Sequence, residues 1–154
     1  MEGIPPVNIT AVVHLFFVAA FFGLYGAEVV VETYYSKKDE EHPIAIRSHY
    51  LMDLYVEIPL MLGIFVSGVI LAVLVGKLTM LHITLIACGT LTVLGCIFNW
   101  YRFVRTRNLE IQKETIDYDL LNRIRKRCAV YVAVVFNPLL IATIVIGFWL
   151  AYHR

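Results

Sequence analysis

The chain has 154 residues, of which 60% are hydrophobic, and its mean hydropathy is +0.75. This composition excludes an ordinary soluble domain and indicates an integral membrane protein, with the lipid bilayer as its surroundings. The net charge of only +1 gives no reason to expect a nucleic-acid partner.

Four apolar stretches are each long enough to cross about 30 Å of hydrocarbon, at roughly 20 residues per crossing. They run over about 8–31, 53–75, 78–100 and 129–151. Short connections and alternating directions predict an all-α fold, an integral membrane four-helix up-down bundle that forms a single transmembrane domain over 1–154. The N-terminus lacks the basic start and the cleavage site of a secretory signal sequence, so we expect the first stretch to stay in the membrane.

The connection between the third and fourth stretches, 101–127, is strongly charged. Residues 114–127 place apolar side chains on one face and predict a cytoplasmic amphipathic helix with Thr115 as its N-cap. Eight of the 13 Lys and Arg residues lie within 101–127, and three more lie within 37–47. The positive-inside rule therefore predicts that both long connections are cytoplasmic and that both termini lie outside the inner (cytoplasmic) membrane.

Two histidines lie inside apolar stretches, and ionisable residues at membrane depth are usually functional. His14 and His82 each follow the expected outer end of their helix, Asn8 and Gly76, by six residues. An equal depth on two helices predicts a shared ligand, and a haem b held between two imidazoles is the first candidate. Gly89, on the same face as His82, would let the flat ring approach the backbone. The alternatives are another metal ion, or two interfacial histidines that hydrogen-bond to backbone or water.

A second polar layer is expected near the cytoplasmic side. Its members are Glu28, Glu32, His49, Asp53 and Glu57. Four carboxylates with an imidazole resemble a hard-metal ligand set, although the Glu-x-x-His pattern of di-iron bundles is missing. Alternatively, Glu28, Asp53 and Glu57 could relay protons to a redox centre or a quinol. The third interpretation is that these charges are solvated at the interface, some of them paired with Arg47 or Arg102.

The first stretch, HLFFVAAFFGLYGAE, resembles the small membrane haem proteins of the HemJ-type protoporphyrinogen oxidase and CopD-like superfamily, in which a histidine followed by seven or eight residues and a glycine anchors a b-haem. The third stretch, MLHITLIACG, is similar to the family segment that begins with His or Lys, and His82 falls on the family's lysine. The second and fourth stretches share its proline, Ser-Gly and Phe-Asn patterns. The resemblance implies that His14 anchors haem b. A histidine at position 82 favours electron transfer over substrate oxidation.

The first functional hypothesis is therefore a membrane b-type haem protein, a possible oxidoreductase, that exchanges electrons with quinone or a partner subunit. The alternatives are a haem-free metal- or ion-handling protein that uses the inner acids, a HemJ-like porphyrinogen oxidase, and a structural subunit of a larger membrane complex. Because so little of the chain lies outside the bilayer, we expect it to form homo-oligomers or to assemble with other membrane subunits.

Overall fold

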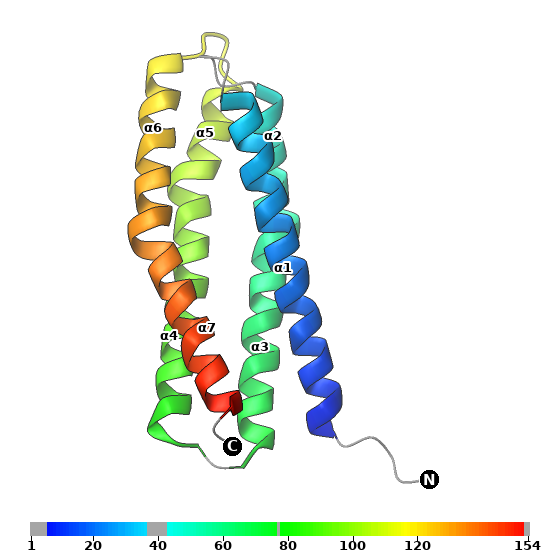
Figure 1. The fold of residues 1–154 in the computed structure, drawn as a ribbon. Helices are drawn as coiled ribbons and strands as arrows, with labels where there is room; N and C mark the ends of the chain where they lie inside the picture. The colour runs from blue at the N-terminus through cyan, green and yellow to red at the C-terminus, as the bar shows by residue number, and fades with distance from the viewer. Residues whose placement is uncertain (1–5, 37–42, 77, 153–154) are drawn as a thin grey trace.

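The computed structural model describes residues 6–36, 43–76 and 78–152, and over these residues it contains helices and turns but no strand. The helices join into four long rods (Figure 1). In chain order the rods are α1 (Pro6–Ser36); α2 (Pro43–Met52), η1 (Asp53–Glu57) and α3 (Ile58–Leu74); α4 (Met80–Asn99), η2 (Trp100–Val104) and α5 (Arg105–Glu110); and α6 (Tyr118–Tyr131), η3 (Val132–Phe136) and α7 (Asn137–Tyr152). The predicted all-α, four-helix membrane bundle is confirmed.

Each rod contains a segment of 29 to 35 residues that is apolar enough to cross a membrane. At 1.5 Å per residue these segments are about 44–52 Å long, whereas the hydrocarbon core is about 30 Å thick. The rods therefore extend beyond a bilayer. The predicted connection 101–127 is mostly part of two rods, because α5 continues α4 to Glu110 and α6 runs into α7.

The start of α6 differs from the sequence-based prediction. Asp117, not Thr115, is the N-cap, since its carboxylate accepts a hydrogen bond of 2.8 Å from the backbone N–H of Leu120. Both residues are polar and lie close to the helix start, but Asp117 directly precedes the first residue of α6, Tyr118, and so stands at the N-cap position.

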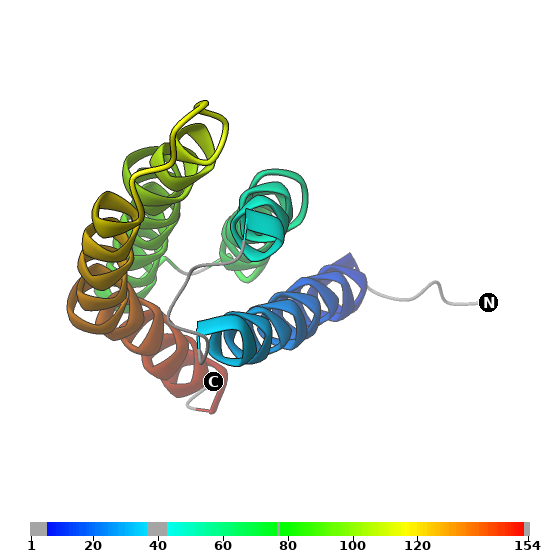
Figure 2. The ribbon, with the colours of Figure 1, turned by 90° about the horizontal axis from the view of Figure 1, so that it is seen from above.

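The rods pack in chain order, α1 against α3, α3 against α4, and α4 against α7 (Figure 2). Small residues allow close approach: a Cβ added at Gly63 would lie 2.9 Å from the ring of Phe17. Gly76, with φ of +76°, makes the turn between α3 and α4. This turn, the start of α1 and the end of α7 lie at one end of the bundle (Figure 1). The opposite end, which we call the loop end, carries α2, α5 and the start of α6.

Three short π-helical turns, η1, η2 and η3, interrupt the rods near the loop end. In each, a backbone N–H bonds five residues back, as Ile58 does to Asp53 and Asn137 to Val132. Two of these turns are followed by proline, Pro59 and Pro138, which have no N–H to donate to the preceding turn. The altered bonding pattern accommodates that missing donor, and π-turns of this kind occur frequently at functional sites.

Candidate metal centre

The acidic centre, which we define as Glu28, Glu32, His49, Asp53 and Glu57, lies toward the loop end of the bundle. Glu28 and Glu32 come from α1, His49 comes from α2, and the other two carboxylates begin and end η1. Counting 1.5 Å per residue from Leu74 at the α3–α4 turn, Glu57 lies about 26 Å along the rod. This distance is close to the full thickness of a hydrocarbon core, about 30 Å.

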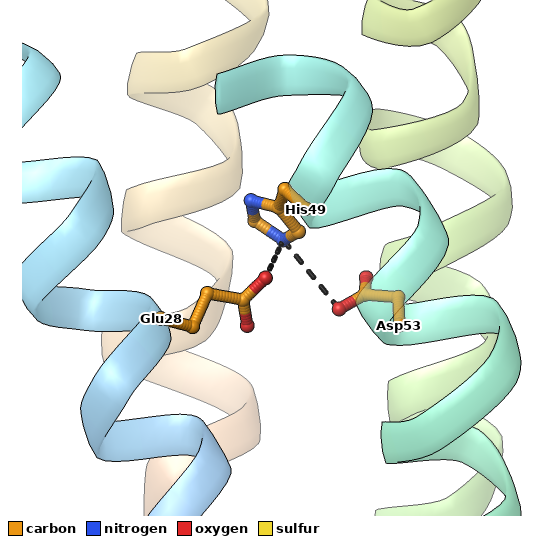
Figure 3. A group of neighbouring side chains, drawn as sticks. All are labelled: Glu28, His49 and Asp53. Carbon is orange, nitrogen blue, oxygen red and sulfur yellow. Dashed lines mark ion pairs between the residues drawn. The ribbon is translucent and has the colours of Figure 1, made fainter. Parts of the chain in front are cut away.

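His49 is the hub of the centre. Its Nε2 atom lies 3.4 Å from Glu28 Oε1 and 3.6 Å from Asp53 Oδ1, and both carboxylates point toward the ring (Figure 3). The three side chains are 10%, 12% and 5% exposed. One nitrogen and two oxygens of these residues lie within 4.8 Å of one another, as a shared metal ion requires. The predicted convergence of Glu28, His49 and Asp53 therefore occurs in the structure.

The separations within this group suit a transition-metal ion. Two ligand atoms that each lie about 2.1 Å from a tetrahedral zinc-like ion are about 3.4 Å apart. The two distances from His49 Nε2, 3.4 and 3.6 Å, are close to that value. An ion can therefore be bound between these atoms with only small side-chain movements.

Glu32 orients the imidazole from the other side. Its Oε1 atom lies 2.6 Å from His49 Nδ1 and also accepts a hydrogen bond of 2.9 Å from Arg107 Nη1. Metal-binding histidines usually donate their second ring N–H to a carboxylate in this way, which fixes the tautomer and the ring orientation. Glu32 thus belongs to the support of the site, and its side chain, 31% exposed, is more accessible than those of Glu28 and Asp53.

Arg107 is a residue of the site that sequence reasoning missed. The expected basic partners, Arg47 and Arg102, are both exposed, whereas Arg107 is 4% exposed and pairs with Glu32. At 100° per residue, a continuous helix already places Arg107 about 20° from Cys96, on the face that lines the bundle, whereas Arg102 lies about 120° away. The helical periodicity of the third stretch, extended beyond residue 100, could therefore have identified Arg107.

Glu57 is a buried and only partly satisfied member of the centre. The residue is 6% exposed, and its Oε1 atom is buried without a hydrogen-bond partner. Glu28 Oε1 is also buried without a hydrogen bond, because its distance from His49 Nε2 is that of an ion pair only. Buried carboxylate oxygens without partners destabilise a protein by several kcal/mol unless a cation compensates them.

A cavity of about 130 Å³ lies among these residues. It is bordered by Asp53 and Glu57 of η1, by Val132 and Phe136 of η3, and by Asn99, which precedes η2. Two of the π-turns, η1 and η3, therefore border the same space, and the third, η2, begins directly after a residue that borders it. The cavity can hold several water molecules or a partly hydrated ion.

The charges that line the cavity favour a divalent occupant. Four carboxylates border it, and the arginines that border it are Arg107 and Arg125. With a neutral imidazole as ligand, the two arginines and one divalent cation balance the four carboxylates if all four are ionised. Imidazole and carboxylate ligands together suit first-row divalent ions such as Mn²⁺, Fe²⁺ and Zn²⁺.

The outer histidine of α1 lies against α3. His14 Nδ1 lies 3.0 Å from Ser67 Oγ, and a Cβ added at Gly68 would lie 3.2 Å from the His14 ring. The Ser67 hydroxyl donates to the Gly63 carbonyl at 2.6 Å. His14 is thus held by Nδ1 at the α1–α3 contact.

The outer histidine of α4 caps its own helix. His82 Nδ1 accepts a hydrogen bond of 3.3 Å from the backbone N–H of Thr79, and the Thr79 hydroxyl lies 2.8 Å from the same nitrogen. In a neutral imidazole the proton is then on Nε2, which is buried without a partner. Among the described residues, no hydrogen bond or ion pair joins His82 to His14.

The two outer histidines also differ in depth. A Cβ added at Gly89 would lie 3.3 Å from the Phe65 ring, which aligns this part of α4 with α3. From that level, His82 lies seven residues toward the α3–α4 turn, but Ser67, the partner of His14, lies only two. The offset is about 7 Å along the bundle. The equal depth predicted from Asn8 and Gly76 is therefore wrong, because α1 begins at Pro6 and α4 only at Met80.

Comparison of the chain with protein-family models, with curated proteins and with solved structures gave no match. The resemblance to the HemJ-type and CopD-like proteins therefore stays a prediction.

Proposed function

We propose that this protein is an integral membrane protein that binds a divalent metal cation at the acidic centre, through Glu28, His49 and Asp53. The observation that carries the proposal is the buried, unpartnered Glu57 carboxylate oxygen beside three side chains whose ligand atoms already lie together. Glu57 offers a fourth protein ligand, and Glu32 orients His49 from behind. In this proposal the protein ligands of the cation are therefore Glu28, His49, Asp53 and Glu57.

Binding of Mn²⁺ tests the proposal, because its paramagnetic resonance signal distinguishes the free ion from the bound one. We expect the purified protein to bind one Mn²⁺ and to lose this binding in His49→Ala and in Asp53→Asn. The matched control is Glu114→Gln, which removes an exposed acid from the loop end. Absence of Mn²⁺ binding in the wild-type protein, or binding that survives both ligand substitutions, would overturn the proposal.

A b-type haem on His14 and His82 is the second candidate function, with electrons exchanged with quinone or a partner subunit. One observation favours it: His82 Nε2 is buried without a hydrogen-bond partner and remains for a ligand. Iron ligation by His82 requires its proton to move from Nε2 to Nδ1, and the two rings must bridge the offset in depth.

A visible spectrum of the purified, reduced protein tests the haem. If a haem is bound, a sharp absorption band disappears in His14→Ala and in His82→Ala. His49→Ala, which removes the hub of the acidic centre, leaves the spectrum unchanged. The same three variants therefore separate the two candidate functions, because Mn²⁺ binding is expected to respond in the opposite pattern. A spectrum without haem absorption in the wild-type protein would remove this candidate.

A further inference from the structure

The polar face of α1 continues beyond the acidic centre into the membrane half of the bundle. At 100° per residue, Glu32, Glu28, Tyr25, Phe21 and His14 lie within about 40° of one line along the helix. The polar members of this line each meet another helix. Glu32 and Glu28 meet His49, the Tyr25 hydroxyl donates to Asn137 Oδ1 at 3.2 Å, and His14 meets Ser67 at 3.0 Å. Polar contacts thus recur at three levels that span about 21 Å from Glu28 to His14.

A packed apolar layer lies between the acidic centre and the His14–Ser67 level, next to the Tyr25–Asn137 hydrogen bond. It consists of Phe21, Met61, Cys96 and Phe136, which are 1% to 7% exposed and form one packed cluster. We call this layer the collar. Cys96 and Phe136 also border the cavity of the acidic centre, so the collar forms the floor of that cavity. Apolar constrictions of this kind close ion paths because water does not fill them.

Beside the collar, the regular hydrogen bonding of the fourth rod is interrupted by a π-turn and a proline. Phe136 is the last residue of η3, and Asn137, the partner of Tyr25, follows it directly and precedes Pro138. The Tyr25–Asn137 hydrogen bond joins α1 to α7, which are not among the extensively packed pairs of helices in the described chain. This hydrogen bond, which we call the latch, therefore connects two weakly packed helices next to the collar.

We propose that the protein translocates the divalent cation that it binds, and that the collar, latched by Tyr25–Asn137, is the gate between the acidic centre and the His14–Ser67 level. The cation enters at the loop end past the more exposed Glu32 and reaches Glu28, His49 and Asp53. Opening of the latch lets Phe21 and Phe136 separate, and the cation then passes toward His14. This inference rests on the proposed function, since it requires a cation at the centre.

Uptake of Mn²⁺ into vesicles tests the gate. The full-length protein is reconstituted into liposomes that contain a fluorescent indicator quenched by Mn²⁺, and Mn²⁺ is added outside. We expect quenching faster than in protein-free vesicles. Phe21→Leu, which thins the collar, and Tyr25→Phe, which removes the latch hydrogen bond while keeping the ring, should each raise the rate several-fold. Phe22→Leu is the matched control, because Phe22 is adjacent but 39% exposed on the outer surface.

Two further measurements make the outcomes decisive. Asp53→Asn should abolish uptake, and Mn²⁺ binding is measured in detergent for every variant. Intact binding with no uptake above that of protein-free vesicles in any variant overturns translocation and leaves the metal centre standing. Uptake that persists in Asp53→Asn, or equal rates for Phe21→Leu and Phe22→Leu, overturns the gate. Loss of Mn²⁺ binding in the wild-type protein overturns the proposed function, and the translocation with it.

Discussion

Glu32→Gln is the most informative single substitution in the acidic centre, because Glu32 touches the proposed ion only through His49. Its Oε1 atom lies 2.6 Å from His49 Nδ1 and 2.9 Å from Arg107 Nη1, so one oxygen holds both the imidazole and the guanidinium in place. Glutamine keeps the length and an acceptor oxygen but loses the charge. Hydrogen bonds to a charged group are roughly twice as strong as neutral ones.

The expected loss follows from the role of a carboxylate behind a metal-binding histidine. Removing such a partner typically weakens metal binding by about 10- to 100-fold, which is about 1.4 to 2.7 kcal/mol. Titration of the purified variant with Mn²⁺ at fixed pH measures this change directly, with Glu114→Gln as the exposed control. The protein should remain folded and helical, as circular dichroism can verify. An Mn²⁺ affinity equal to that of wild type would show that Glu32 does not orient the ligand and would refute this part of the reasoning.

Three further predictions concern packing, charge and sidedness. Gly63→Ala should lower stability by about 1–3 kcal/mol, because its Cβ would lie 2.9 Å from an α1 aromatic ring; Gly26→Ala, with no atom within 4 Å, should not, and thermal unfolding in detergent compares them. Glu57→Gln should raise the metal-free melting temperature, since it removes one of four clustered buried carboxylates and so relieves like-charge repulsion, yet weaken Mn²⁺ binding; a lower melting temperature would contradict this. Labelling from outside the cell should reach Gly3→Cys and miss Gln112→Cys, and the reverse pattern would overturn the predicted orientation.

The features of the fold that depend on composition were predictable. Four apolar stretches, their alternating directions and the tight turn at Gly76 were enough to predict the bundle. The position of the acidic centre was also predictable, because Glu28, His49 and Asp53 each lie near the same end of the apolar stretches in the sequence. The structure brings these three side chains together.

The details that failed depend on where a helix begins and ends and on individual side-chain contacts. The depth of His82 was misjudged because α4 begins at Met80, after Thr79 caps it, and not directly after Gly76. Arg107 was overlooked because residues after 100 were treated as a connection outside the bundle, whereas η2 and α5 continue the rod of α4 to Glu110. Glu32 was predicted as a possible ligand, but its role behind His49 could be recognised only from the two contacts of one oxygen.

The π-turns have a further consequence for the bundle as a whole. In a continuous α-helix, the residues that face the bundle at one end determine, through the 3.6-residue period, which residues face it at the other end. An extra residue in the turn rotates everything beyond it by about 100°, so each half of a rod can follow its own pattern. Because the second, third and fourth rods all contain such a turn at or next to the cavity, the membrane half can vary its apolar side chains for packing while the loop-end half keeps its charged residues aimed inward.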